Sequence, residues 1–278
     1  MLKRLGVTLG LALLLGGCAD SSMISSQQTP SIPTKQVSDH DLNQQQLSGL
    51  LWMQRAAEYR ALCYQAFNIA HERVNQALNQ DHDKPLAVIV DIDETVLNNT
   101  PYQAWLLDQD HGFSNQSWHR WVKSAQATAI PGALGFLNYV SENGIQVFYI
   151  TNRQDSEKQP TLTNLKQLGF PNADASHLLM RTTTSNKGAR RYSVHRQFDI
   201  AVYLGDNLAD FSSQFGGKTT EQRNDLTTQN QSQWGAQFII LPNPIYGGWE
   251  SALIHYNGKA STAEKDRLRR QALLPWHP

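Results

Sequence analysis

Five consecutive apolar residues run directly into two closely spaced aspartates, and this junction constrains the fold more than any other feature. The run is Leu86–Val90, and Asp91-Ile92-Asp93 follows it at once. An unbroken apolar segment of this length is typical of a strand in a parallel sheet that is buried on both faces. Like charges this close repel unless a cation or a proton separates them. The junction therefore indicates either a divalent-metal site or a plain acidic turn.

Polar residues also follow three other apolar segments, as they would at the ends of further strands. The three continuations are Thr151-Asn152-Arg153 after residues 146–150, a stretch with Lys187 after residues 178–180, and Gly205-Asp206-Asn207-Leu208-Ala209-Asp210 after residues 200–204. Open parallel sheets bind ligands outside the carboxyl ends of their strands. The sequence therefore predicts one crevice that collects acids, a hydroxyl, an amide and a lysine, the groups that hold a metal and a phosphate.

Taken in order, these four segments resemble the four motifs of the haloacid dehalogenase (HAD) superfamily. The stretches at residues 91–102 and 241–250 are similar to those of the class C acid phosphatases, the bacterial outer-membrane lipoprotein e family of nucleotidases. The resemblance runs from about residue 45 to about residue 255. It implies an α/β fold, with a Rossmann-like parallel sheet flanked by helices and a small helical cap.

The resemblance also implies a role for each motif. Asp91 would attack phosphorus and form an aspartyl-phosphate, and Asp93 would protonate the leaving oxygen and then activate water. Thr151 and Asn152 would donate hydrogen bonds to the phosphoryl oxygens, and Lys187 would neutralise the phosphate. The alternatives are a turn-forming Asp93, a Thr-Asn turn after a strand and a solvated surface lysine.

Mg²⁺ is the expected cofactor, because the available ligands are hard oxygens and no His or Cys cluster accompanies them. By resemblance, Asp91 and Asp206 would bind through carboxylates and Asp93 through its backbone carbonyl. Asp210 has two interpretations of equal weight. It holds a metal-bound water, or it begins a helix, where an acid near the N-terminus is favourable.

Two aromatic residues occupy places where family members clamp a flat ring of the substrate. They are Trp118 in the cap and Tyr246 in the final loop, and their alternative role is ordinary packing. Asn98-Asn99 stands where relatives often carry an acid. We expect this pair to lie outside the residues that contact the substrate and to leave the mechanism unaffected.

The N-terminus has the pattern of a processing segment. Lys3 and Arg4 precede an apolar stretch that ends in Leu15-Gly16-Gly17-Cys18, too short to span a bilayer as a permanent helix. Small residues before a cysteine resemble a bacterial lipoprotein signal, with cleavage before Cys18 and lipid on its thiol. The alternative is an ordinary secretory signal. Ala19 resembles the sorting pattern for the outer membrane, so we expect a lipid-anchored protein of the bacterial cell envelope.

Composition and periodicity suggest how the chain is divided. The expected parts are a signal peptide at 1–17, a disordered tether at 18–41, the phosphatase domain at 42–258 with its cap from the N-terminal helices and about 97–130, and a peripheral tail at 259–278. Helices are expected at about 131–143, 158–168 and 187–197, and residues 212–234 as an exposed excursion.

Lys plus Arg equals Asp plus Glu at 24 each, so polymeric nucleic acid is not an expected partner. The expected function is a Mg²⁺-dependent acid phosphatase that hydrolyses phosphomonoesters such as 5′-nucleotides or nicotinamide mononucleotide. The alternatives are a nonspecific acid phosphatase, a phosphotransferase, or a surface binding lipoprotein without catalysis. A homodimer is expected from the family.

Overall fold

The computed structural model describes residues 36–277. The predicted signal peptide, the lipidation at Cys18 and most of the predicted tether lie outside these residues. Among residues 36–277, no helix combines the length and the apolar character that a membrane span requires.

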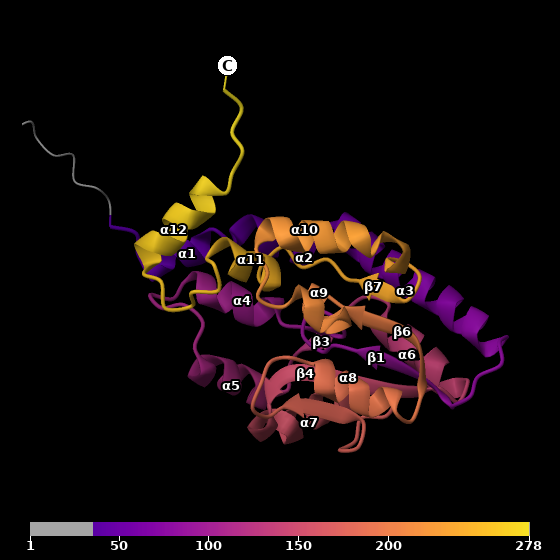
Figure 1. Ribbon diagram of the computed structural model, residues 1–278. Helices are drawn as coiled ribbons and strands as arrows, with labels where there is room; N and C mark the ends of the chain where they lie inside the picture. The colour runs from indigo at the N-terminus through magenta and orange to yellow at the C-terminus, as the bar shows by residue number, and fades with distance from the viewer. Residues whose placement is uncertain (1–35, 278) are drawn as a thin grey trace, which may run out of the picture. The chain divides into compact units, whose positions relative to one another are not determined.

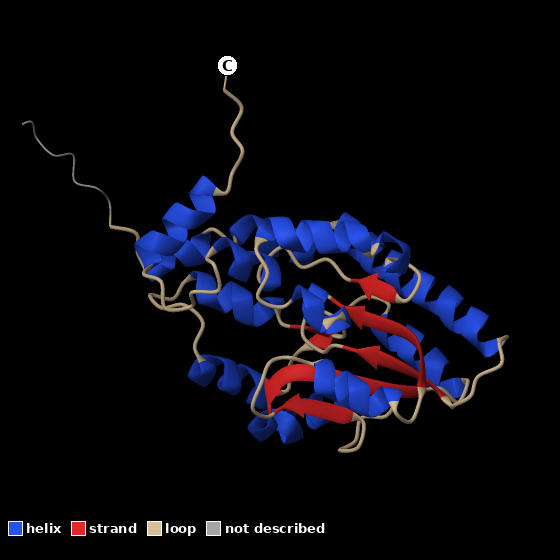
Figure 2. Cartoon of the chain, in the orientation of Figure 1, coloured by secondary structure: helices blue, strands red, loops and turns tan. Residues whose placement is uncertain are grey.

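A five-stranded parallel sheet lies at the centre of the fold (Figures 1 and 2), which confirms the predicted α/β class. Its strands, in the spatial order β5-β4-β1-β6-β7, are β5 (Leu178–Arg181), β4 (Gln146–Gln154), β1 (Leu86–Val90), β6 (Asp199–Gly205) and β7 (Phe238–Ile240). Every neighbouring pair is parallel. The carboxyl ends of the strands therefore lie at one edge, and the end of β1 is central.

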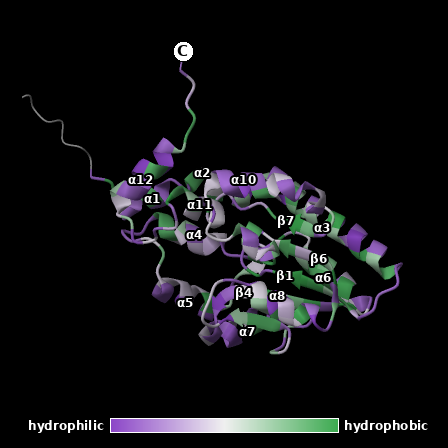
Figure 3. Ribbon diagram, viewed as in Figure 1, coloured by the Kyte–Doolittle hydropathy of each residue, from purple (hydrophilic) through white to green (hydrophobic). Residues whose placement is uncertain are grey.

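Alternate residues of the strands face two separate cores. Val88 and Val90 belong to the core under α3 (Ala57–Leu78), α6 (Ala133–Glu142) and α7 (Lys158–Leu168). Ala87 and Ile89 belong to the core under α8 (Gly188–His195) and α9 (Leu208–Phe211). Full burial of one Val or Ile side chain contributes about 1.5–3 kcal/mol. Burial on both faces explains why β1 is an unbroken apolar run, as the hydropathy colouring of β1 and β6 illustrates (Figure 3).

The cap is inserted between β1 and β4. Its chain forms β2 (Leu97–Asn98), α4 (Thr100–Leu107), α5 (Asn115–Ser124) and β3 (Thr128–Ala129), and β2 pairs with β3 in the antiparallel direction. The first two helices, α1 (Asp39–Gln44) and α2 (Leu47–Arg55), contact α4. Asn43 joins them, because its Nδ2 lies 2.8 Å from the Leu106 carbonyl. Two segments that are distant in the sequence therefore pack together here.

The segment at 212–234 is largely exposed, although Phe215 and Arg223 are buried, and it contains a helix that we did not predict. It forms η2 (Ser213–Phe215), α10 (Thr220–Gln229) and η3 (Gln231–Gln233). Thr219 and Gln222 cap the start of α10 reciprocally. A threonine followed three residues later by glutamine is a helix-start signal. The polar composition of the segment concealed it.

The C-terminal region continues as α11 (Gly248–Leu253) and α12 (Thr262–Gln271). Within the predicted tail, α12 is tied to the start of the fold. The Gln45 amide donates to Asp266 at 2.6 Å, and the Thr262 hydroxyl donates to Asp39 at 2.9 Å. The first helix begins at Asp39, three residues before the expected start of the domain.

Candidate active site

Three predicted site residues meet at the carboxyl edge of the sheet. The Lys187 ammonium lies 2.5 Å from Asp91 Oδ1 and 2.7 Å from Asp210 Oδ1. All three side chains are at most 11% exposed. Carboxylate oxygens of Asp91, Asp206 and Asp210 also lie within 4.8 Å of one another. The residues that follow β1, β5 and β6 therefore form one buried cluster, as the parallel sheet requires.

Local structure fixes the position of each carboxylate. The Asp91 backbone N–H donates to the Leu204 carbonyl at 3.0 Å, which extends the pairing of β1 with β6 by one residue. Asp210 is the third residue of α9, where its Oδ2 accepts the backbone N–H of the N-cap residue Asn207 at 3.0 Å. Its Oδ1 faces Lys187. Asp210 therefore caps a helix and belongs to the cluster at the same time, so the helix position that we considered does not remove it from the site.

Asp206 is held by donors from two loops. Thr95 Oγ1 lies 3.2 Å from its Oδ1, and Asn243 Nδ2 lies 2.8 Å from its Oδ2. Asn243 comes from the loop after β7 and was not recognised from the sequence. These two hydrogen bonds orient the Asp206 carboxylate, which lies close to the carboxylates of Asp91 and Asp210.

The cluster carries more negative than positive charge. Burial raises the pKa of Asp91 well above its usual value, and the nearby acids Asp210, Asp206 and Asp93 add to this rise against the opposing effect of Lys187. Burial, together with Asp210, raises the pKa of Asp206 to about 7. Burial alone would lower the pKa of Lys187, but the charges of Asp210 and Asp91 outweigh it and raise this pKa. Lys187 therefore remains the cation, and it donates directly to two of the three carboxylates.

This excess of buried negative charge fits a divalent cation. Carboxylate oxygens are hard ligands, which Mg²⁺, Ca²⁺ and Mn²⁺ prefer over softer metals. HAD phosphatases use a divalent metal, and Asp91, Asp206 and Asp210 form a donor set that could hold one. The carboxylate of Asp93 is not part of this set.

The Asp93 side chain instead points to a buried arginine. Arg153 is 2% exposed, and its Nε and Nη2 lie 3.0 and 2.8 Å from Asp93 Oδ1. Its Nη1 donates to Thr161 Oγ1 at 3.1 Å, which anchors the guanidinium from α7. In the sequence, Arg153 is recognisable only as part of a motif. Its contact with Asp93 depends on the extension of β4 to Gln154, four residues beyond the apolar run.

Asn99 is a second partner of Asp93 that was not recognised from the sequence, where we expected Asn98-Asn99 only to lie outside the residues that contact the substrate. Asn99 is fully buried, and its Nδ2 lies 2.9 Å from Asp93 Oδ1. Its Oδ1 accepts the Trp121 indole N–H at 2.7 Å. Asn98 instead accepts the Thr100 backbone N–H at 2.9 Å and helps to begin α4.

Thr151 and Asn152 follow the apolar part of β4. Thr151 is buried and its Oγ1 accepts the Arg153 backbone N–H at 3.1 Å, whereas Asn152 is exposed. Arg190 on α8 holds both, by donating to the Thr151 carbonyl and, at 2.8 Å, to Asn152 Oδ1. Its neighbour Arg191 donates to the carbonyls of α9 and supports the loop of Asp210.

The two predicted ring-binding residues each contact a neighbour of Asp93. The Trp118 ring centroid lies 5.6 Å from Arg153 Cζ and 5.2 Å from the Tyr102 ring. The Tyr246 hydroxyl donates to Glu94. Burial raises the pKa of Glu94 well above its usual value, and Asp93 and Asp206 add to the effect. Within residues 36–277, no ring contact joins Trp118 to Tyr246.

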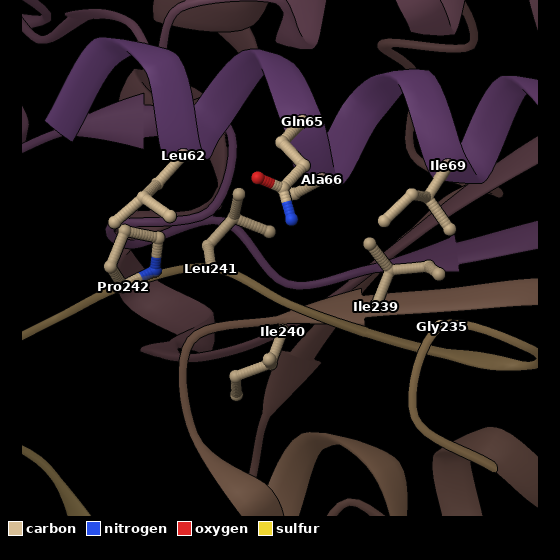
Figure 4. Close-up of a pocket in the computed structure, with 9 residues that line it drawn as sticks. All are labelled: Leu62, Gln65, Ala66, Ile69, Gly235, Ile239, Ile240, Leu241 and Pro242. Carbon is tan, nitrogen blue, oxygen red and sulfur yellow. The ribbon is translucent and has the colours of Figure 1, made fainter. Parts of the chain in front are cut away.

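An apolar cavity of about 280 Å³ lies on another part of the fold, between α3 and the edge strand β7 (Figure 4). Its lining residues are Leu62, Gln65, Ala66, Ile69, Gly235, Ile239, Ile240, Leu241 and Pro242. No acidic or basic side chain lines it, so it lacks the groups that bind a metal or a phosphate.

Comparison with known proteins identifies this arrangement. The family model described as HAD superfamily, subfamily IIIB (Acid phosphatase), matches residues 14–249. The chain belongs to this family. Its members are phosphoric monoester hydrolases, and the match confirms the resemblance found in the sequence.

Two solved structures share the fold over most of the chain. The class C acid phosphatase from Bacillus anthracis is 40% identical, with a TM-score of 0.82, and the match covers 85% of this chain and 99% of that one. A second structure of that enzyme, with tungstate bound, has a TM-score of 0.83 at the same identity and coverage. The fold of this chain is therefore that of the class C acid phosphatases.

A curated plant relative is more distant. Acid phosphatase 1 of Solanum lycopersicum is 29% identical over 162 residues, which is 57% of this chain and 57% of that protein. The chain thus spans a little over half the length of this relative.

Proposed function

We propose that this protein is a Mg²⁺-dependent acid phosphatase that hydrolyses small phosphomonoesters through an aspartyl-phosphate on Asp91. The observation that carries the proposal is the cluster of buried Asp91, Lys187 and Asp210 with half-buried Asp206, beside Asp93. Tungstate, which binds to the Bacillus anthracis relative, is a tetrahedral oxyanion like phosphate. This likeness supports a phosphate site in the family's fold.

Asp91 has the position that a nucleophile needs. It follows the central strand, and its hydrogen bond from Lys187 uses one oxygen, Oδ1. Oδ2 is then the oxygen that attacks phosphorus, which forms the Asp91–phosphorus bond as the ester oxygen leaves. Lys187 remains beside the reacting carboxylate, where its charge favours the approach of a phosphate dianion.

Asp93 would supply the proton that the leaving alkoxide needs. After the leaving group departs, the same carboxylate would take a proton from the water that attacks the aspartyl-phosphate. Hydrolysis then releases phosphate and restores Asp91. Arg153 and Asn99 hold Asp93 beside this exchange.

Asp91, Asp206 and Asp210, with the backbone carbonyl of Asp93, would hold the Mg²⁺. When bound, the ion supplies positive charge that offsets the phosphate and the crowded carboxylates. Thr151 and Asn152 would hold the phosphoryl oxygens.

We propose 5′-nucleotides, nicotinamide mononucleotide and similar aromatic monophosphates as substrates. Trp118 is half-buried at the cap, and Tyr246 is half-buried in the loop after β7. Stacking of a base on an aromatic side chain contributes about 1–3 kcal/mol and tolerates different bases. Such a site would select a flat ring rather than one particular base.

We also propose that the protein is lipidated at Cys18 and anchored in the bacterial cell envelope, at the outer membrane, and that it forms a homodimer. The support is the sequence Leu15-Gly16-Gly17-Cys18-Ala19 and the family resemblance. Metabolic labelling with palmitate would test the anchor, because Cys18→Ser should lose the label. Light scattering of the detergent-solubilised protein would test the dimer.

The decisive experiment measures phosphate release by the full chain from a panel of phosphomonoesters, with Mg²⁺ or EDTA. The panel contains 5′-nucleotides, nicotinamide mononucleotide and 4-nitrophenyl phosphate. Asp91→Asn should abolish turnover while it leaves the fold intact. An added alcohol acceptor would distinguish hydrolysis from phosphotransfer. A folded protein that releases no phosphate over a broad pH range would favour a binding lipoprotein instead.

A further inference from the structure

Asp93 receives three N–H donors, and all three contact the same oxygen. Arg153 Nε, Arg153 Nη2 and Asn99 Nδ2 lie within 3.0 Å of Asp93 Oδ1. Within residues 36–277, none of these donors reaches Oδ2. An oxygen with three N–H donors has no free lone pair for a proton, since a carboxylate oxygen offers about two acceptor positions. Oδ2 is therefore the oxygen that can give and take one.

The orientation of the Asn99 amide decides whether this arrangement exists. The two ends of an asparagine amide have nearly the same shape, so only its hydrogen-bond partners determine which end faces Asp93. The Trp121 indole N–H is a donor and cannot accept. Because it lies 2.7 Å from Asn99, it requires the amide oxygen at that end. The amide nitrogen then faces Asp93.

Two further side-chain contacts reinforce this orientation. Arg153 Nη2, also a donor only, lies 3.3 Å from Asn99 Oδ1. At the other end of the amide, Asn99 Nδ2 lies 3.4 Å from the acceptor Glu94 Oε2. A flipped amide would place two donors against an NH₂ group and a carbonyl oxygen against a carboxylate. Each of these contacts would be repulsive in a buried site.

We infer that Asn99 is a positioning residue for Asp93, and that Trp121 on the cap helix α5 sets its orientation. This inference rests on the proposed phosphatase function. It assigns a role in proton transfer to the cap, which the proposed function uses only to bind the substrate ring. Arg153 supplies two of the three donors to Asp93, and the third, Asn99, is held in the required orientation when Trp121 on α5 is docked against it.

Leaving groups of different basicity provide the test. A nitrophenolate leaves readily without a proton, whereas the alkoxide of a 5′-nucleotide depends on one. A general acid contributes about 10²–10⁴-fold in rate where the leaving group needs it. We expect Trp121→Phe, which keeps an aromatic ring but removes the N–H, to lower kcat/KM for adenosine 5′-monophosphate about 10-fold more than for 4-nitrophenyl phosphate. Asn99→Asp, which removes the amide donor, should have the same selective effect.

Each variant has a matched control. Trp105→Phe makes the same change on α4, at a side chain that is 40% exposed and stacks near Arg120. Asn98→Asp makes the same change next to Asn99 and keeps the acceptor for Thr100. Neither control should change the ratio of the two kcat/KM values. If Trp121→Phe fails to fold, Asn99→Asp still tests the inference.

The outcomes separate the positioning role of Asn99 and Trp121 from the proposed phosphatase function. Equal losses on both esters, or no loss on either, would overturn the positioning role, because a structural defect does not distinguish leaving groups. A wild-type protein that hydrolyses neither ester would refute the proposed function itself. Selective loss in both variants, with wild-type ratios in both controls, would establish the role.

Discussion

Lys187 and Asp91 form a buried ion pair, with the ammonium nitrogen 2.5 Å from the carboxylate oxygen. The pair joins the start of α8 to the end of β1, and Lys187 extends it to Asp210 on α9. Such a pair is part of the reaction site and part of the packing between three elements. Its removal should therefore affect both stability and turnover.

Lys187→Met should leave two buried carboxylates without their cation. Removal of one partner of a buried ion pair costs about 3–5 kcal/mol. Urea unfolding in EDTA measures this loss. The control is Lys166→Met on the exposed side of α7, which should change stability by less than about 0.5 kcal/mol. Equal unfolding midpoints for the two variants would contradict the role of Lys187.

Gly205→Ala should disturb the site from within the sheet. A Cβ at this position would lie 2.5 Å from Asp210 Cβ, so the side chain of Asp210 would have to move away from Lys187. Overpacking of this kind costs about 1–3 kcal/mol, and turnover should fall with it. Gly135→Ala is the control, since nothing lies within 4 Å of its added Cβ and alanine favours the helix by about 1 kcal/mol. The prediction fails if Gly205→Ala unfolds at the same urea concentration as the wild type.

Mg²⁺ should stabilise the folded protein, because it binds a site that exists only after folding. At a concentration 100 times its Kd, a ligand adds about 2.7 kcal/mol to the free energy of unfolding. Calorimetry with Mg²⁺ and with EDTA measures the shift in Tm. Asp206→Asn should lose most of this shift, while Asp110→Asn, on an exposed part of the cap, should keep it. A wild-type Tm that does not respond to Mg²⁺ would count against the metal site.

Stability should fall in mild acid in part because of His195. Burial lowers the pKa of His195, and the charges of Lys84 and Arg191 add to this effect. The folded state thus favours the neutral ring. This contribution is fully present above the unfolded-state pKa of about 6.5 and is lost as the pH falls through the folded-state pKa. His195→Gln should flatten the pH dependence of the urea midpoint between pH 8 and pH 5. An unchanged slope would show that other groups cause the acid sensitivity.

The sheet and its sequence of motifs could be predicted because they depend on short segments. The run at 86–90 is apolar throughout since β1 is covered on both faces. Parallel pairing then brings the residues after β1, β5 and β6 to one edge of the sheet, independently of the conformation of the loops. The prediction that Lys187 faces the acids needed no knowledge of side-chain geometry.

The partners of Asp93 could not be predicted in the same way. Arg153 contacts Asp93 because β4 continues past its apolar run, and Asn99 is the residue that precedes α4 at the start of the cap. The contact with Trp121 joins residues 22 positions apart through the docking of α5. Such contacts depend on how a helix packs, and no local pattern in the sequence encodes that.

The hydrogen bonds between α1 and α12 have a practical consequence. Because Gln45 contacts Asp266 and Thr262 contacts Asp39, the two ends of the folded region are neighbours. A short peptide linker could join them, and the gene could be reopened in the loop at 79–85, between α3 and β1. Such a circular permutant would carry its new ends at the amino edge of the sheet, away from the reacting groups, where a fused reporter or an immobilisation tag would not obstruct the substrate.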